Sequence, residues 1–204
     1  MRRNRNLRLL ILTALLAGAL AAGAEARPTL AVREFTNKAG GSVPASAITE
    51  MMTTELFEAG LFTLVEREKL NYVGEEIRLG QSGLMDESTA PELGKIKGAR
   101  YSMTGAVTEY HYKAAGGAVP IPGVGGVGGA SNTAYVTLDI RLIDNQTSEV
   151  VYAAAERGAS NQTLGGLVTK YGGFGAGKIN GILAAATRKA VVKHVEAMKD
   201  LKLE

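Results

Sequence analysis

Residues 110–137 are the part of the sequence that most restricts what the chain can fold into. No charged residue occurs from Ala114 to Leu138, and glycines and prolines separate the large apolar residues. Those apolar residues are Val119, Ile121, Val124 and Val127. A surface loop of this length normally carries charge, and the glycines and prolines oppose a stable helix. The stretch is therefore either covered by protein, or it enters lipid as β-structure whose backbone groups pair between subunits.

The first 26 residues predict an export signal. Four arginines lie within residues 1–8, and an apolar run of about 14 residues extends from Leu9 to Ala22. Small residues at Ala24 and Ala26 follow it. This run is short of the roughly 20 residues that span a bilayer, so a secretory signal peptide fits better than a retained anchor, which is the alternative. We predict a signal peptide over residues 1–26 and an exported chain over residues 27–204.

Charge and composition narrow the classes of partner and cofactor. The chain holds 23 Lys and Arg against 20 Asp and Glu, but four of the arginines and Glu25 belong to the predicted signal, which leaves 19 of each sign. A neutral mature chain gives no electrostatic support for nucleic acid as a partner. The sequence has no cysteine and only two histidines, His111 and His194. We therefore expect no disulfide, no lipidated cysteine, no metal site and no cofactor.

The first half of the exported chain alternates short strands and helices. Thr29–Phe35 reads as a strand that ends in turn residues 36–41. A helix then starts at Pro44 or Ser46, and Gly60 ends it. The remaining predicted elements are a strand at Phe62–Val65, a helix carrying Leu70, Val73 and Ile77, and a short helix from about Ser88 carrying Leu93 and Ile96. This order predicts an α/β fold with a mixed sheet covered by helices.

Longer strands dominate from Tyr101 onwards. Met103, Gly105 and Val107 share one face of a strand, but beyond Val107 the apolar and polar positions exchange. We read this exchange as a change of surroundings, from a domain sheet to a membrane interface; an edge strand with two solvent-facing tyrosines is the alternative. The clean alternation over residues 134–142 predicts the return strand, and residues 145–148 a hairpin turn.

The C-terminal part repeats the glycine-rich composition and then becomes helical. Residues 158–177 carry a single charge, at Lys170, and an alanine-rich segment from Ile179 to Leu201 predicts a helix. We expect His194 to lie on the solvated face of this helix, beside Lys193 and Glu196.

Two glycine-rich motifs resemble nucleotide-binding loops without meeting their requirements. Gly123–Gly128 matches the dinucleotide fingerprint, but a strand follows where a helix is needed. Gly172–Lys178 approaches the phosphate-binding loop, but Ile179 stands where a hydroxyl should hold magnesium. The spacing yields no set of nucleophile, base and orienting acid, so we predict that the protein is not an enzyme.

Five segments together resemble, in order and spacing, the CsgG family of curli-type secretion channels and their holdfast-anchor relatives. These segments are Val32–Gly40, Leu64–Leu70, Gly98–Tyr110, Leu138–Asp144 and Thr147–Val150. The resemblance covers nearly the whole exported chain. It implies a periplasmic α/β domain that assembles into a homo-oligomeric ring. Each subunit would lend two β-hairpins, here residues 108–137 and 153–179, to one outer-membrane barrel that exports unfolded subunits of extracellular fibres or adhesins.

The resemblance and the residue pattern together assign roles to three sets of residues. The membrane hairpin would contain Tyr110, Tyr112, Val119, Ile121, Val124, Val127 and Tyr135. The side chains facing the lumen would be Glu109, His111 and Lys113. The equivalents of the family's constriction loop would be Val43, Pro44, Ser46 and Ile48.

This sequence departs from the family pattern at the anchor and at the gate. It lacks the lipid-carrying cysteine, and its segment Gly40–Ser46 is shorter than the family's aromatic constriction loop and has no aromatic residue. These departures favour the alternative of a soluble periplasmic binding or scaffold module with the same fold. The partners to be distinguished are therefore outer-membrane lipid, a secreted polypeptide and another envelope protein.

Overall fold

The computed structural model describes residues 27–67, 69–86, 88, 96–122, 125–168 and 179–203. Within them the chain forms a mixed α/β fold with three helices, so the predicted fold class is confirmed to that extent. The strands are β1 (Thr29–Val32), β2 (Thr36–Asn37), β3 (Thr63–Leu64), β4 (Tyr101–Ile121), β5 (Gly125–Asp144) and β6 (Val150–Val168). The helices are α2 (Ala45–Ala59), α3 (Leu70–Gln81) and α4 (Ile179–Met198).

One sheet contains all the described strands, in the order β3-β1-β4-β5-β6, with β2 also paired to β4. The short strands β1, β2 and β3 pair in parallel, as expected for strands joined through helices. The three long strands form an antiparallel meander. Because β3 and β6 are its outer strands in the described part of the chain, the sheet is open rather than closed.

Helix α2 follows the predicted pattern. Pro44 precedes its first turn, where a missing N–H costs nothing, and Gly60 ends it in the left-handed conformation with φ of 64°. Its inward residues Ile48, Met52 and Leu56 are buried. These side chains place α2 against the core of the sheet.

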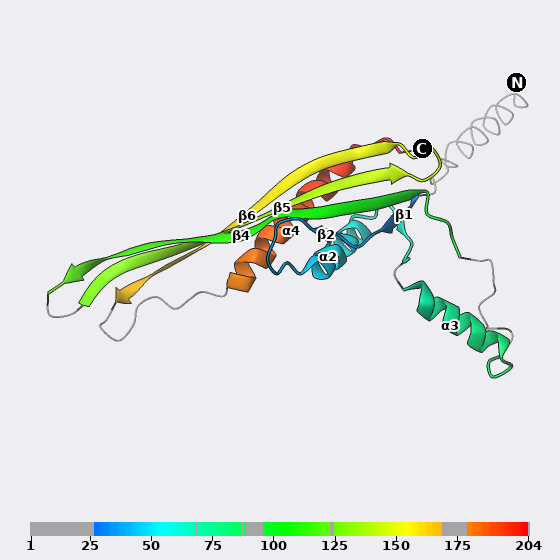
Figure 1. Ribbon diagram of the computed structural model, residues 1–204, viewed down its shortest axis with the longest axis horizontal. Coiled ribbons are helices and arrows are strands. Elements are labelled where there is room, and N and C mark those ends of the chain that lie inside the picture. Colours follow the sequence, from blue (N-terminus) through cyan, green and yellow to red (C-terminus); the bar gives the residue numbers. More distant parts are fainter. Residues whose placement is uncertain are drawn as a thin grey trace, which may run out of the picture.

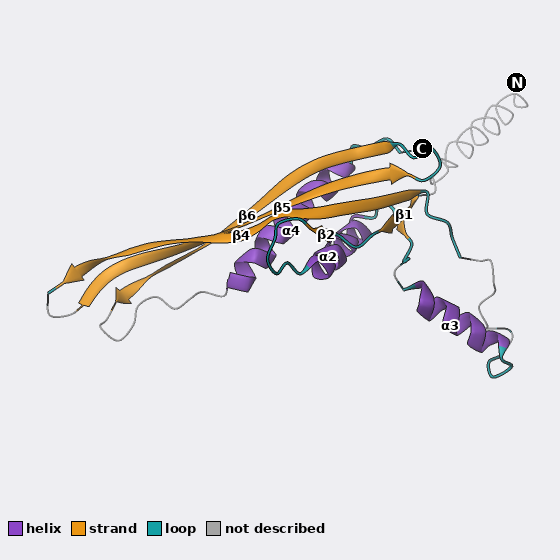
Figure 2. Cartoon of the chain, viewed as in Figure 1, coloured by secondary structure: helices purple, strands orange, loops and turns teal. Residues whose placement is uncertain are grey.

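Helix α4 lies on the same face of the sheet as α2, so the two helices form one layer (Figure 2). Its inward positions include two small residues, Ala186 and Ala190, which are fully buried. Small side chains let the helix approach β6 closely at Gly158. There an added Cβ would overlap the Ala186 carbonyl oxygen and lie 2.7 Å from the Ala190 nitrogen. An ion pair of 2.9 Å between Arg188 and Glu55 joins the two helices.

Several predictions for the first half differ from the structure in detail. Residues Thr36 and Asn37, expected in a turn, pair with Ala106 and Val107 of β4. In α3 only Ile77 is buried, whereas Val73 is 41% exposed. This helix lies away from the sheet (Figure 1). The short helix expected around Leu93 falls mostly outside the described residues.

The long strands continue well past the helices. At about 3.3 Å per residue, the 21 residues of β4 span roughly 70 Å. The 20 residues of α4 span only about 30 Å. We call the projecting part the arm and define it as residues 109–121 of β4, 125–137 of β5 and 157–168 of β6, which are paired row by row. Figure 1 shows the arm extending from the body as a narrow, three-stranded blade. Residues 169–178, which contain the return of the second predicted hairpin, lie outside the described residues, as do residues 1–26.

Candidate functional site

A β-bulge at Thr108 marks the junction between body and arm. Val107 pairs with Leu138 and Glu109 with Thr137, so Thr108 is an extra residue in β4. Its hydroxyl donates to Asp139 Oδ2 at 2.6 Å. A bulge shifts the alternation by one residue, and the odd-numbered core positions of β4 become even-numbered beyond it. The exchange of polarity after Val107 therefore has a different cause from the one predicted, because the apolar side of the strand continues on the same face of the sheet.

The register divides the arm residues between two faces in a way that corrects the sequence assignment. Tyr110 pairs with Val136 and Tyr112 with Ala134, on the face that carries the helices lower down. Tyr135 pairs with His111 and therefore lies on the opposite face. The three tyrosines, all assigned to the membrane hairpin, are thus divided between the two faces of the arm. Alternation along β4 places Val119 and Ile121 on the same face as Glu109, His111 and Lys113, so these two sets do not face opposite compartments.

Glycines in the arm reveal which face is concave. An added Cβ at Gly116 would lie 3.1 Å from the Cβ of Ala130, and one at Gly128 would lie 2.8 Å from the Cβ of Ala118. Directly opposed Cβ atoms normally lie about 4.5 to 5.5 Å apart. These positions share the face of Tyr110 and Tyr112, whereas Gly117 on the other face has no neighbour within 4 Å. From this crowding we infer that the face with the two tyrosines is concave and the face with Tyr135 convex.

The convex face changes character along its length. Near the body it carries charged and aromatic side chains, and beyond Lys113 the described strands carry no charge. The pair Val119 and Val127 lies opposite each other close to the tip and is exposed by 72% and 50%. Val124, also assigned to the membrane hairpin, lies outside the described residues. The convex face thus combines a charged base with an uncharged, partly apolar end.

Five residues at the base of the convex face form a connected cluster, which we call the collar: Glu109, His111, Lys113, Tyr135 and Arg157. Arg157 Nη2 donates to Glu109 Oε1 at 2.7 Å, and its guanidinium carbon lies 4.2 Å from the centre of the Tyr135 ring. Lys113 Nζ lies 5.8 Å from the same ring centre, and the His111 ring centre 5.5 Å from it. Tyr135 is therefore surrounded by cationic or basic groups, a favourable arrangement for its π face.

The carboxylate of the collar is held in its charged form. Burial by itself raises the pKa of Glu109, but hydrogen bonds from Thr137 and Arg157 and the Arg157 charge outweigh it and hold that pKa below its ordinary value. Thr137 Oγ1 donates to Glu109 Oε2 at 2.7 Å. Both carboxylate oxygens thus have donors, and the negative charge is compensated within the cluster.

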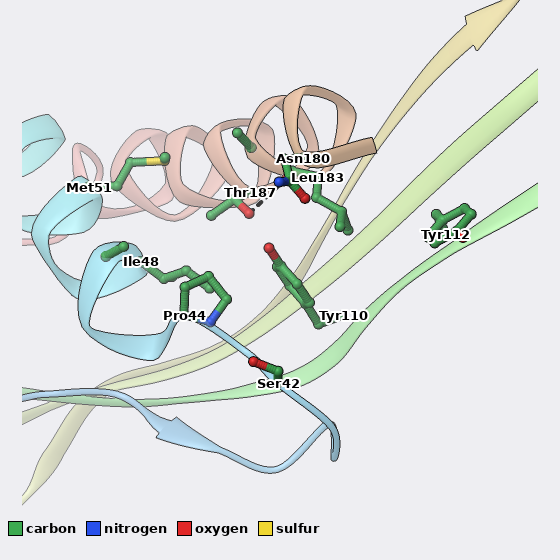
Figure 3. Close-up of a pocket in the computed structure, with 11 residues that line it drawn as sticks. Ser42, Pro44, Ile48, Met51, Tyr110, Tyr112, Asn180, Leu183 and Thr187 are labelled. Carbon is green, nitrogen blue, oxygen red and sulfur yellow. Dashed lines mark hydrogen bonds between the residues drawn. The ribbon is translucent and has the colours of Figure 1, made fainter. Parts of the chain in front are cut away.

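A groove lies at the base of the concave face, between the arm and the two helices (Figure 3). Its volume is about 610 Å³. Tyr110 and Tyr112 line one side, Pro44 and Met51 the α2 side, and Leu183 the α4 side. Tyr110 points its ring into this space, and burial raises the pKa of its hydroxyl. The lining of the groove is mostly apolar.

Of the predicted constriction residues, Pro44 and Ile48 line this groove, and the four residues differ in exposure. Pro44 and Ser46 are exposed, and Val43 is partly buried against the core. Ile48 is only 2% exposed and belongs to the core beneath α2. The Ile48 side chain is packed inward from α2 and does not project freely, whereas Pro44 and Ser46 are exposed; the assignment of these residues to a constriction stays a prediction.

The structure also corrects the position of His194. Its side chain is fully buried between α4 and the sheet, with Nδ1 2.9 Å from the Tyr152 hydroxyl and Nε2 2.9 Å from the Leu138 carbonyl oxygen. Since the carbonyl can only accept, Nε2 donates to it and Nδ1 accepts from Tyr152 in the neutral ring. Burial lowers the pKa of His194, against the smaller opposing effects of the Leu138 hydrogen bond and the Glu156 and Asp139 charges. The prediction from Lys193 and Glu196 that His194 lies on the solvated face of the helix is therefore wrong.

Neither a metal-binding cluster nor a membrane-spanning helix is found among the described residues. No group of three or more histidine, cysteine or acidic side chains lies close enough to hold a metal ion there. None of the helices in that part of the chain has both the length and the apolar character needed to cross a membrane.

Comparisons with known proteins agree with the resemblance in the sequence. A family model described as "Curli production assembly/transport component CsgG" matches residues 13–202. No curated protein sequence matches the chain.

Solved structures of low sequence identity resemble the chain over most of its length. A PelC dodecamer from Paraburkholderia phytofirmans is 19% identical, with a TM-score of 0.39, over 87% of this chain and 92% of that one. The hypothetical protein CT253 from Chlamydia trachomatis is 9% identical, with a TM-score of 0.48, over 86% and 98%. The LpoB C-terminal domain from Salmonella enterica is 20% identical, with a TM-score of 0.35, over 71% and 92%. With a family match that extends over nearly its whole length, this chain belongs to the CsgG family.

Proposed function

We propose that the protein is one subunit of a ring-forming outer-membrane channel that exports the subunits of extracellular fibres or adhesins, with no enzymatic step of its own. The observation that carries this proposal is the arm. It projects from the body with two edges that pair with nothing else among the described residues, β4 beyond Thr108 on one side and β6 on the other. Unpaired edges of this length promote aggregation unless another strand covers them. Copies of the same chain arranged in a ring would cover both.

The two faces of the arm also fit this role. In a membrane barrel the convex side faces lipid and the concave side faces the lumen. The exposed valine pair Val119 and Val127 lies on the convex side. The concave side carries small residues and the polar side chains of Asn132 and Gln162, which pair with each other across β5 and β6. Contact with lipid is thus assigned to the face opposite Tyr110 and Tyr112.

The uncharged section is about four-fifths as tall as the apolar band of roughly 25 Å that outer-membrane barrels carry, which suits a thin membrane. From Lys113 to Ile121 a strand advances by about 26 Å, which at a tilt of about 40° corresponds to a height of about 20 Å. Bacterial outer membranes are thinner than average bilayers. The arm would therefore cross the hydrocarbon layer with its tip at the far surface and its collar at the periplasmic surface.

A second candidate function is a soluble periplasmic scaffold whose arm docks on another envelope protein. Among the described residues of the arm above the collar, only Val119, Ile121 and Val127 are large apolar side chains with known exposure. This is a small apolar surface for contact with lipid, and a protein partner would cover it equally well.

Fractionation of the full-length protein expressed in a Gram-negative cell tests the two candidates. The channel predicts an outer-membrane protein that is released only by detergent and that sizes as a large ring in mild detergent. A monomer or dimer recovered in the aqueous periplasmic fraction would contradict the channel and support the scaffold.

A further inference from the structure

We propose that the collar binds the phosphate headgroups of anionic lipids at the periplasmic surface of the outer membrane, and that it thereby fixes how deeply the arm inserts. The inference rests on the proposed function, since only an inserted arm brings the collar to that surface. It concerns Lys113 and Arg157 as the phosphate-binding cations, with His111 and Tyr135 beside them.

The first argument is the position of the charges along the arm. Lys113 is the last charged residue of β4 before the tip, and Arg157 is the last charged residue within β6. The last charge of β5 on this side is Asp139, which lies nearer the body and accepts the Thr108 hydroxyl. The outermost charge on each of β4 and β6 is therefore a cation. Lys113 borders the uncharged section, and Arg157 lies four residues lower, in the row of Glu109 and Thr137, from where its long side chain would reach towards the headgroup phosphates.

The second argument is that the one carboxylate of the collar is already satisfied. Glu109 takes hydrogen bonds of 2.7 Å from both Arg157 and Thr137. The Arg157 side chain nevertheless remains 52% exposed, and Lys113 is exposed as well. A guanidinium has five N–H donors in a planar fork, so pairing with Glu109 leaves donors for a phosphate. The collar thus presents a surplus of accessible positive charge.

The third argument is the aromatic residue at its centre. The Tyr135 ring lies between Arg157 and Lys113 on the convex face. Tyrosines flanked by long cationic side chains are favoured at membrane interfaces, where the ring meets the edge of the hydrocarbon and the cations reach the headgroups. Its place directly below the uncharged section matches such an interface.

The net charge of the exported chain would not attract it to an anionic membrane. Outside residues 1–26 the chain carries 19 positive and 19 negative residues, so any preference for an anionic membrane has to arise locally. Each lysine or arginine close to an anionic surface strengthens binding by about fivefold. The effect would be repeated in every subunit of a ring.

The test compares the insertion of the full-length protein into two kinds of vesicle, one of phosphatidylcholine alone and one containing phosphatidylglycerol. Insertion is scored as protein that resists carbonate extraction. We expect the wild type to favour the anionic vesicles. The double variant K113Q/R157Q should lose roughly 25-fold of this preference, counted as about fivefold for each cation. High salt should reduce the wild-type preference in the same direction.

Three further variants separate charge from folding. K199Q/K202Q makes the same charge change just beyond the C-terminal end of α4 and should leave the preference intact. R157K keeps the charge and should retain most of it. E109Q removes the only carboxylate of the collar and should increase the preference, an effect that simple damage to the arm would not produce.

The outcomes distinguish the two levels of the proposal. Equal insertion into both vesicles by the wild type and K113Q/R157Q would overturn the collar while leaving the channel intact. Failure of the wild type to insert into either vesicle would overturn the channel and the collar together. If free phosphate stabilises the protein against heat through Lys113 and Arg157 while the vesicles are not distinguished, the collar binds a soluble anion and the lipid assignment is wrong.

Discussion

At the scale of single residues, Gly158 decides how closely α4 can approach the sheet. A Cβ at this position would overlap backbone atoms of α4, which cannot turn away as a side chain can. We expect Gly158→Ala to destabilise the body by about 3 kcal/mol or more. Thermal or urea unfolding followed by circular dichroism measures the loss. Gly98→Ala is the matched control, because Gly98 has no neighbour within 4 Å, and its stability should change by less than about 1 kcal/mol. Equal effects of the two substitutions would contradict the close approach.

His194 gives the body a predictable dependence on pH. Its pKa is lowered in the folded protein, so below the ordinary value of 6.5 the unfolded chain binds more protons than the folded one. The contribution of His194 to stability is therefore complete above pH 6.5 and falls as the pH decreases from there towards the folded pKa. Urea unfolding at a series of pH values from about 7.5 to 5 should show this decline.

Two histidine variants assign that decline to one residue. H194Q keeps hydrogen-bonding groups near Tyr152 and Leu138 but cannot titrate, so it should remove most of the dependence in this range. H111Q, at the exposed histidine of the collar, is the matched control. If H111Q abolished the decline in stability and H194Q did not, the buried ring would not be the titrating group.

At the scale of the elements, the Thr108 bulge determines which face of the arm meets which surroundings. Val119 is placed on the convex face and its neighbour Ala118 on the concave face. If the convex face contacts lipid, Val119→Asp should impair insertion, because a charge facing the hydrocarbon costs up to a few kcal/mol in each subunit. Ala118→Asp makes the same change one residue away and should be tolerated, since it points to the lumen.

Carbonate-resistant membrane association of the two variants measures this difference. Both should retain a folded body, because the arm tip contributes little to the core. If Ala118→Asp proved the more harmful of the two, the faces would be reversed. Equal and full association of both variants would favour the scaffold.

At the scale of the whole molecule, the unpaired edges of the arm predict contacts between copies. The chain has no cysteine, so introduced thiols can be followed without background. Ala115 of β4 and Thr163 of β6 lie in the same row, two strands apart, which corresponds to about 10 Å. Because a disulfide needs Cα atoms within about 7 Å, cysteines at these positions cannot be joined within one copy.

We therefore expect the pair Ala115→Cys and Thr163→Cys to form disulfides only between copies. In a ring, the strand beside β4 of the next copy would be either β6, which runs in the same direction as β4, or the predicted return strand after β6. Second cysteines should therefore be introduced in turn at residues 159–163 and at residues 169–178. Non-reducing gels should show a ladder that ends at one closed species. Absence of any cross-link along both ranges, or a product that stops at dimers, would argue against a ring.

The sequence alone determined the elements whose signals are local. The apolar spacing of Ile48, Met52 and Leu56 and the left-handed stop at Gly60 set α2, because helix periodicity and termination depend on neighbouring residues. The charge-free composition of residues 114–138 likewise identified the unusual segment, and the ordered motifs identified the family.

Only the tertiary structure decided how those elements face each other. The bulge at Thr108 depends on the pairing of β4 with β5, and a shift of one residue transfers every later side chain to the other face. Tyr135 was separated from Tyr110 by that register, and the collar was assembled from three strands whose spacing in the sequence gives no sign of contact. His194 is buried because α4 packs against β5 and β6 at that point. Its neighbours Lys193 and Glu196 are exposed, so their polarity did not predict the burial of His194. Local patterns set the elements, and long-range pairing and packing determined which side chains meet.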